Sequence, residues 1–358
     1  MFDQMLDIVY ERGVGSRERI SGLVRVLEKS CPDASELWRS DDIPRWEHEI
    51  RIAAVDGSYN RLDFRNFVLF AIDAESVMYE GDGIRNRQEA VVDLLRPYRY
   101  AKNRLQLYMT LLEMRLAYLT LEVERPDRLL FDGSLYGHAI RPMPFEREIS
   151  EETRSRVMED YLPELQAAIE SNRAMITSFL FFDGMQKDFR DEFAEAASYL
   201  EYLERLLVLS MLLNRYRNSL IGISKTAQRT DFFNAEVPDM AIFERSTKGA
   251  GWSIPVRLPL QREAKRGFPI LDDFYRGLDF MTCYARLEDG ANMLRLEFPY
   301  AIDEREIVRN LSLLRETSAG GYPYLLRRAH RDVVIGHQDM ERLAHLFGLF
   351  GRTGREML

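Results

Sequence analysis

The hydrophobic positions of this chain change period several times, and the changes divide it into helical and strand-like segments. In residues 2–30, apolar and charged positions alternate at near-helical spacing around an interruption at Gly13–Ser16, which predicts two short amphipathic helices. Residues 31–48 contain prolines and several acids and are predicted to form a connector. Ile52–Val55, followed by Asp-Gly, and Phe67–Ile72 are short apolar runs typical of buried strands.

Helical patterns and short strands then alternate along the rest of the chain. Residues 86–122 form one long helical pattern that Pro97 interrupts, and residues 150–217 are largely helical with a break near Asp183-Gly184. Further strands are predicted at Arg128–Phe131 and Ser219–Ile223, a hairpin at Phe280–Leu287 and Met293–Phe298, and closing helices at 303–316, 323–331 and 338–349. Strands interleaved with helices predict an α/β fold with a mixed sheet flanked by helices.

Composition excludes several classes of protein. The chain has 358 residues, of which 46% are apolar, so it has material for a full core and is not a disordered tail. Lys and Arg number 49 against 58 Asp and Glu, a net charge of −9, so any nucleic-acid contact needs a local basic groove. Two cysteines, Cys31 and Cys283, cannot make a Cys₄ zinc site.

The N-terminus and the apolar runs bear on where the protein acts. Met1–Tyr10 has no Lys or Arg and lacks the pattern of a secretory signal. No apolar run approaches the roughly 20 residues needed to cross a bilayer. We therefore expect a soluble, cytoplasmic protein with no membrane contact.

Two predicted strands end in the same letters, Val55-Asp56-Gly57-Ser58 and Phe131-Asp132-Gly133-Ser134. An acid at the end of a buried strand lies at the rim of the sheet, where open α/β sheets bind ligands. The glycine lets the backbone turn sharply and approach a ligand closely. Asp-Gly is also a common plain turn, so a catalytic acid and a simple turn both stay open.

Glu113 is a stronger indication of chemistry. Leu105–Leu121 is apolar nearly all round, and its only charged residues are Glu113 and Arg115, which point to different faces. A buried, unpaired carboxylate costs on the order of several kcal/mol, so its partner is either an Arg from another element or a metal ion. Together with Asp56 and Asp132 it would give three acids on separate elements. Such a set suits Mg²⁺ or Mn²⁺, which can activate water for attack on a phosphoryl group.

A histidine lies in a basic stretch near the C-terminus. His330 follows a helix start at Pro323, and Arg327, Arg328 and Arg331 surround it. In an acidic protein this cluster is either a phosphate-binding edge or a solvated helix face.

Two other phosphate chemistries are excluded by position. An aspartyl-phosphate phosphatase needs a second Asp two residues after the nucleophile, where this chain has Ser58 and Ser134. Taking either Asp as the second acid would need an Asp at Ala54 or Leu130. No G-x-x-x-x-G-K-[ST] run is present, so a phosphate-binding-loop ATPase is unsupported.

Taken in order, these segments resemble the NurA family of nucleases, the partners of the HerA hexameric DNA translocase. The resemblance runs from about Ile52 to Asp332, and Glu113 precedes Asp132 by 132 − 113 = 19 residues, a spacing similar to that of the family. The segments that carry it are Ala54-Val55-Asp56-Gly57-Ser58, Ala74-Glu75-Ser76-Val77, Leu130-Phe131-Asp132-Gly133-Ser134-Leu135, Ile223-Ser224-Lys225, Tyr284-Ala285-Arg286-Leu287 with Gly290, and Gly321-Tyr322-Pro323 with Ala329-His330.

The resemblance implies an RNase H-like core and a manganese-dependent nuclease, with Mg²⁺ as a second possible cofactor. It implies ring-like homodimers with a central DNA channel. The implied activities are 5′→3′ exonuclease on single- and double-stranded DNA and endonuclease on single strands. These serve DNA end resection in double-strand-break repair with a HerA-type hexameric ATPase.

The same resemblance assigns roles to residues. The implied metal ligands are Asp56, Glu113 and Asp132, with His330 as a further ligand or active-site base. Tyr322 would touch phosphate or order water. The implied DNA contacts are Lys225 and, lining the channel, Arg327, Arg328, Arg331 and the basic run at 245–266.

The domain organisation follows from the extent of the resemblance. Residues 1–45 are predicted to form an N-terminal helical segment and 46–358 the nuclease domain, with a helical insertion at about 146–217. Two other functions compete with the nuclease. One is a non-catalytic adaptor that guides DNA on the translocase, and the other is an RNase H-like enzyme that acts on RNA.

Overall fold

The computed structural model describes residues 2–30, 32–40, 43–81, 83–143, 146–171, 176–262 and 267–349. Its strands are β1 (Trp38–Arg39), β2 (Arg51–Asp63), β3 (Val68–Glu80), β4 (Gly83–Leu95), β5 (Arg128–Asp132), β6 (Leu220–Ser224), β7 (Gly251–Ser253), β8 (Val256–Pro259), β9 (Asp279–Arg286), β10 (Leu294–Phe298), β11 (Ser318–Ala319) and β12 (Tyr322–Pro323). Its α-helices are α1 (Phe2–Ser30), α2 (Ala101–Val123), α3 (Leu135–Ile140), α4 (Glu151–Arg156), α5 (Leu162–Ile169), α6 (Phe182–Phe189), α7 (Phe193–Tyr216), α8 (Asp239–Ser246), α9 (Asp272–Arg276), α10 (Glu304–Glu316), α11 (Tyr324–Asp332) and α12 (His337–Leu346).

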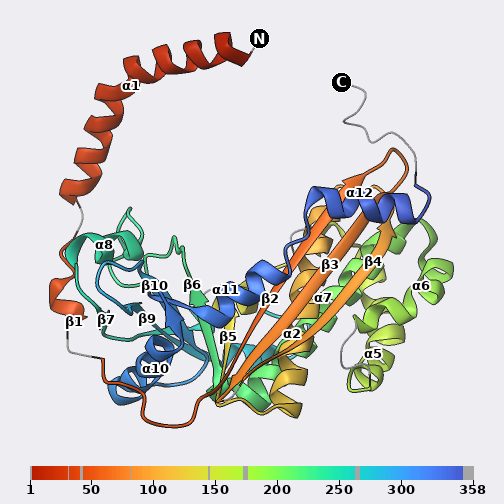
Figure 1. The fold of residues 1–358 in the computed structure, drawn as a ribbon. Helices are drawn as coiled ribbons and strands as arrows, with labels where there is room; N and C mark the ends of the chain where they lie inside the picture. Colours follow the sequence, from red (N-terminus) through yellow and green to blue (C-terminus); the bar gives the residue numbers. More distant parts are fainter. Residues whose placement is uncertain are drawn as a thin grey trace.

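A mixed sheet runs through the molecule (Figure 1). Its strand order is β1-β7-β9-β10-β6-β5-β2-β3-β4, and β8 pairs with β9 beside this path. β5 is parallel to both β2 and β6, and the other pairs of this sheet are antiparallel. A parallel pair needs a long connection, and the chain between β2 and β5 supplies it with β3, β4 and α2. The predicted strands and the final hairpin are confirmed, and so is the mixed α/β sheet flanked by helices.

The two faces of the sheet are covered by different helices (Figure 1). Alternate residues of each strand point to opposite faces. On β2, Ala53 and Val55 join a core that includes residues of α2, α3 and α7. Ile52 and Ala54 join a second core with residues of α10 and α11. The position of a residue in its strand therefore decides which helices it faces.

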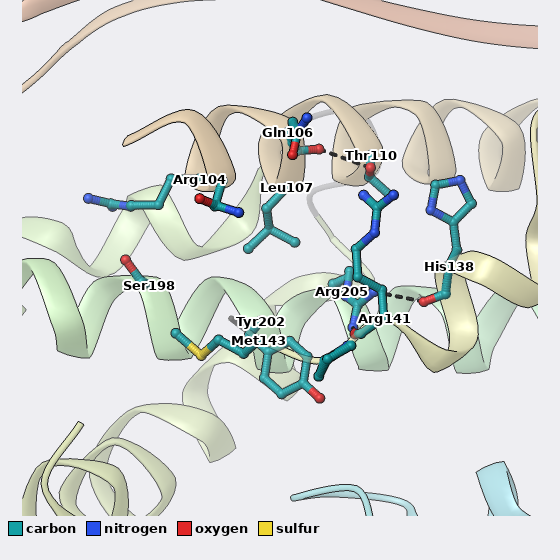
Figure 2. Close-up of a pocket in the computed structure, with 12 residues that line it drawn as sticks. Arg104, Gln106, Leu107, Thr110, His138, Arg141, Met143, Ser198, Tyr202 and Arg205 are labelled. Carbon is teal, nitrogen blue, oxygen red and sulfur yellow. Dashed lines mark hydrogen bonds between the residues drawn. The ribbon is translucent and has the colours of Figure 1, made fainter. Parts of the chain in front are cut away.

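The predicted helical block is present, and it packs through α7 against α2. Arg104 of α2 and Glu201 of α7 form a buried ion pair, which the Tyr108 hydroxyl joins at 2.6 Å from Glu201 Oε1. Next to this pair lies a small pocket of about 50 Å³, which Figure 2 shows between side chains of α2, α3 and α7. The Arg205 guanidinium closes one side and donates to the carbonyl of His138. The block is thus fixed to the helix that carries Glu113.

The helix predicted for residues 86–122 is wrong in its first part. Residues 83–95 form β4, and the helix begins only at Ala101. β4 is rich in Arg, Gln, Glu and Leu, which favour helices, but it pairs with β3 over its full length, and this pairing overrides local propensity.

The two predicted N-terminal helices are one. α1 continues through Gly13 and Gly15, because a glycine costs a helix only about 1 kcal/mol. The predicted break in the helical block falls just before Asp183-Gly184. α6 begins at Phe182, so Asp183 lies in its first turn. No described helix is long and apolar enough to cross a bilayer.

Candidate metal centre

The two Asp-Gly motifs lie side by side, but only Asp132 ends a strand. The strand end predicted at Asp56 is wrong, because β2 continues through Asp56 and Gly57 to Asp63 in its ladder with β3. The parallel pairing of β2 and β5 reaches Val55 opposite Phe131, so Asp56 and Asp132 are the next residues in register. Asp56 comes two residues after Ala54, and Asp132 two residues after Leu130, so each points to the same face as its predecessor. This is the face that α11 covers. Asp56 is buried and Asp132 is partly exposed. The plain-turn interpretation is wrong for Asp56-Gly57, which lies inside β2, and the neighbouring positions of the two acids favour a shared site.

His330 reaches the same point from α11. Its Nδ1 lies 2.8 Å from Oδ2 of Asp56, and the other Asp56 oxygen accepts the N–H of Gly57 at 2.8 Å. Ligand atoms of Asp56, Asp132 and His330 all lie within 4.8 Å of one another. Among the described residues, no other three His, Cys, Asp or Glu side chains form such a group. Burial raises the pKa of Asp56, and the charge of Asp132 raises it further. The contacts with His330 and Gly57 lower it, but the net effect is a raised pKa. A cation would relieve this repulsion.

Glu113 approaches from α2 on the opposite face. It is 3% exposed, and its Oε1 is buried without a hydrogen-bond partner in the described part of the chain. Burial raises its pKa well above the ordinary value, and the charges of Asp56 and Asp132 add to the rise. No arginine from the described elements pairs with it, which favours the metal alternative over the ion-pair one. Glu113 is not part of the closest group of three ligand atoms.

Gly57 explains how α2 comes so close to the strand. A Cβ built at Gly57 would lie 3.1 Å from the Met109 side chain and 3.6 Å from Cβ of Glu113. A side chain at this position would crowd the Met109 side chain, which packs between the strand and the helix that carries Glu113. In this motif the glycine therefore serves helix–strand contact.

Lys225 and Tyr322 flank the carboxylates. Nζ of Lys225 donates to Oδ2 of Asp132 at 2.8 Å and lies 4.7 Å from the centre of the Tyr322 ring. The Tyr322 hydroxyl is buried and makes no hydrogen bond by distance and angle in the described structure. Burial raises the pKa of Tyr322, and the charges of Asp132 and Asp56 raise it further. The hydroxyl thus keeps its proton and can donate it to an oxygen of a ligand.

The three predicted arginines of α11 lie in different surroundings. Arg327 donates to the carbonyl of Ala319, and its guanidinium carbon lies 6.0 Å from the centre of the Tyr322 ring, beside the candidate metal centre. Arg328 and Arg331 both pair with Asp332, at 3.4 and 2.8 Å. Arg331 is largely exposed and Arg328 mostly covered. The side chains of Arg327 and Arg331 are therefore more accessible to an anionic ligand than that of Arg328.

The basic run at 245–266 is only partly visible. Arg257 pairs with Asp279 on β9 at 2.5 Å. Residues 263–266, with Lys265 and Arg266, lie outside the described residues. The prediction that this run lines a channel stays a prediction.

Sequence reasoning missed two buried acids near the centre. Glu75 stands directly opposite Asp56 in the β2–β3 pair, is 1% exposed, and keeps one oxygen without a partner among the described groups. Burial raises its pKa. Glu297 on β10 is fully buried. The test applied to Glu113, a charge without a partner in its own element, would not have found Glu297, because Arg295 lies two residues earlier on the same strand, and Glu75 requires the strand register.

The donor set fits a hard divalent cation. Carboxylate oxygens suit Mg²⁺ and Mn²⁺, and an imidazole nitrogen suits transition metals. A cation would bind the unpartnered oxygen of Glu113 and relieve the repulsion between the carboxylates. Asp56, Glu113, Asp132 and His330 are thus the residues that would hold it.

Known proteins resemble this chain over nearly its full length. Residues 50–335 match the model of the NurA domain family. The DNA double-strand break repair nuclease NurA of Sulfolobus acidocaldarius is 28% identical, over 95% of this chain and 94% of the relative. The probable DNA double-strand break repair nuclease NurA of Methanocaldococcus jannaschii is also 28% identical, over 96% of this chain and 90% of its own length.

Solved structures agree with this assignment. The NurA nuclease of Sulfolobus solfataricus superposes with a TM-score of 0.73 at 22% identity, covering 95% of each chain. A NurA crystal structure with manganese gives a TM-score of 0.74 at 17% identity, covering 94% of this chain and 99% of the other. At these identities the likeness shows a shared fold. With the family match over residues 50–335, it follows that the chain belongs to the NurA domain family.

Proposed function

We propose that this protein is a metal-dependent DNA nuclease that hydrolyses phosphodiester bonds. The observation that carries the proposal is the convergence of Asp56, Asp132 and His330, with ligand atoms within 4.8 Å, beside the unpartnered carboxylate of Glu113. The relatives named above are called DNA double-strand break repair nucleases, and one NurA structure contains dAMP and manganese. These names support DNA as the substrate and Mn²⁺ as the ion, and the carboxylate ligands also suit Mg²⁺.

Asp56, Glu113 and Asp132 would hold the ion. When bound, a divalent cation polarises a phosphoryl oxygen and lowers the pKa of a water molecule. Asp56 fixes the ring of His330 through its contact with Nδ1, which leaves Nε2 for a ligand or a proton. His330 thereby serves as a further ligand or as the base that takes a proton from water.

Lys225 and Tyr322 act on the substrate. The Lys225 ammonium already contacts a carboxylate oxygen of Asp132 and can exchange that contact for a phosphate oxygen as DNA enters. The protonated Tyr322 hydroxyl donates to a phosphate oxygen or orders the attacking water. Arg327 and Arg331, with Arg328 behind them, extend the positive charge along the DNA backbone.

The finer parts of the proposal come from the family resemblance. They are an RNase H-like nuclease domain at 46–358 with a helical insertion at 146–217 and an N-terminal segment at 1–45. They also include 5′→3′ exonuclease and single-strand endonuclease activity in end resection, a homodimer, and a HerA-type hexameric ATPase as partner. Light scattering tests the dimer, for which a mass of one chain would contradict the proposal. Co-elution with the ATPase tests the partner.

The function itself is tested by end-labelled single-stranded DNA, with a matched RNA strand, in Mn²⁺, Mg²⁺ or EDTA. We expect cleavage of DNA with Mn²⁺, less or none of RNA, and none in EDTA. Labels at the 5′ and 3′ ends give the polarity, and a circular single strand reports endonuclease activity. Preferential cleavage of RNA would overturn the substrate. Wild-type protein that cleaves nothing in any metal but binds DNA and the translocase would favour the adaptor.

A further inference from the structure

The fully buried carboxylate of Glu297 binds the turn that follows Asp132. Its two oxygens accept the Ser134 hydroxyl at 2.8 and 3.0 Å, and Oε2 also accepts the N–H of Tyr136 at 2.9 Å. Ser134 in turn accepts the N–H of Gly137 and so caps α3. The chain just after Asp132 is therefore held by one side chain from a strand that lies two places away in the sheet.

The sheet is built to let Glu297 reach across. Glu297 lies opposite Gly222 of β6, and Gly222 lies opposite Phe131 of β5. A Cβ at Gly222 would stand 3.1 Å from the carbonyl oxygen of Gly133 and 3.2 Å from the N–H nitrogen of Leu135. The absent side chain leaves room for the turn to lie over β6. Glycine at this position and glutamate across from it are thus parts of one arrangement.

Gly133 restricts the conformation of this turn further. Gly133 has a φ of +115°, which favours glycine, and its N–H donates to the carbonyl of Ile223 at 2.8 Å. Between these contacts and Glu297, the backbone on the C-terminal side of Asp132 is fixed at two points. The carboxylate of Asp132 is thereby aimed at Asp56 and His330.

A buried ion pair holds Glu297 in place. Arg295, 2% exposed, pairs with Glu297 and stands 3.6 Å from Asp231. The partly exposed Asp231 accepts two 2.7 Å hydrogen bonds from Arg229, which is also partly exposed. Because a buried charge without a partner is strongly destabilising, Arg295 and Glu297 depend on each other. This pair is linked to the turn after Asp132 through Ser134 and Tyr136.

We propose that Glu297 is a positioning residue of the metal centre: it sets the direction of Asp132 by holding the turn at Ser134 and Tyr136. The inference rests on the proposed function, because it gives Asp132 the role of a ligand. Side chains that orient metal ligands from behind typically contribute 10- to 100-fold to metal affinity or activity. Glu297 does so without touching the ion or the DNA.

The chain offers a matched control for this inference. Glu204 of α7 is also fully buried, and its carboxylate accepts two backbone N–H groups, those of Thr177 at 2.7 Å and Ser178 at 2.8 Å. It anchors a turn of the helical block instead of a turn beside a ligand. Glu297→Gln and Glu204→Gln therefore make the same chemical change, and only the first lies behind the metal centre.

The experiment measures Mn²⁺ binding directly by calorimetry, cleavage against Mn²⁺ concentration, and the melting temperature without metal. We expect Glu297→Gln to raise the Mn²⁺ dissociation constant and the half-saturating Mn²⁺ concentration about 10-fold. Glu204→Gln should lower the melting temperature comparably and leave both metal constants unchanged. Equal metal constants in Glu297→Gln and wild type would overturn the inference, as would an equal loss in both variants.

Ser134→Ala covers the case in which Glu297→Gln does not fold. It removes the hydroxyl that links Glu297 to the turn and keeps the pair of Glu297 with Arg295. We expect it to weaken Mn²⁺ binding in the same direction, and unchanged binding would count against the inference. If wild-type protein neither binds Mn²⁺ nor cleaves DNA, the proposed function fails and this inference fails with it. A wild type that does both isolates the role of Glu297.

Discussion

At the scale of single residues, the centre gathers carboxylates that destabilise the metal-free protein. Asp56 and Glu113 both have raised pKa values, since both are buried and each feels the charges of neighbouring acids. A protein that kept these groups only for stability would pair them with arginine, as it does for Glu201 with Arg104. Their arrangement indicates that function opposes stability here.

This opposition predicts the effect of Glu113→Gln. Because burial raises the pKa of Glu113 well above its ordinary value of about 4.5, above that pH the folded protein holds a proton that the unfolded chain has lost. Stability therefore falls as pH rises through the window above 4.5. Glutamine cannot ionise, so the metal-free variant should be more stable than wild type at pH 8 and show little difference at pH 4. It should also lose Mn²⁺-dependent cleavage by on the order of 100-fold.

Urea unfolding in EDTA at the two pH values checks this stability prediction. Glu122→Gln on the same helix, a partly exposed acid near Arg215, serves as the control. A Glu113→Gln variant less stable than wild type at pH 8 would mean that Glu113 has a structural partner instead.

Whether a site residue can be predicted from the sequence depends on where its neighbours lie along the chain. Glu113 was identified from sequence because a charge inside an apolar helix demands a partner wherever the helix lies. Glu75 was missed because its importance comes from standing opposite Asp56, and strand register is not visible in the chain. The contacts of Glu297 with Ser134 also join residues far apart in sequence.

At the scale of elements, local propensity and tertiary pairing gave different answers. β4 contains helix-forming residues and was predicted as helix, but its ladder with β3 decides its structure. The apolar runs of β2, β5 and β6 were predicted correctly because burial on both faces leaves a continuous hydrophobic signal, whereas β9 and β10 were predicted as a hairpin. α1 shows the reverse error, in that glycine marked a break that the helix tolerates.

α11 carries the prediction for DNA binding. If Arg327 and Arg331 each neutralise a phosphate, replacing both with alanine should lower the slope of log affinity against log salt by about 1.4 for single-stranded DNA. Fluorescence anisotropy in EDTA, over several salt concentrations, measures it without cleavage. Arg342→Ala, an exposed arginine on α12, is the control. An unchanged slope in the double variant would show that this face of α11 does not contact the backbone.

At the scale of the whole molecule, net charge and function point in opposite directions. The chain carries a charge of −9, yet the described site has Lys225, Arg327 and Arg331 around its acids. Under the proposed function, a local basic edge on an acidic protein restricts DNA to the metal centre. The sequence predicts the acid motifs and the basic cluster at Arg327, Arg328 and Arg331, which it leaves open as a phosphate-binding edge or a solvated helix face. It could not show how α2, β2, β5 and α11 converge, because each contributes one residue from a distant part of the chain.

The central claim is that these converging residues form the metal centre that cleaves DNA. The most direct test is cleavage of end-labelled single-stranded DNA with Mn²⁺ by wild type, Asp56→Asn and Asp63→Asn. Asp63 is an exposed acid at the other end of the same strand, so it controls for loss of charge from β2. The account predicts that Asp56→Asn loses activity by on the order of 100-fold or more, while Asp63→Asn cleaves as wild type does. Undiminished cleavage by folded Asp56→Asn would contradict the account and move the active site elsewhere.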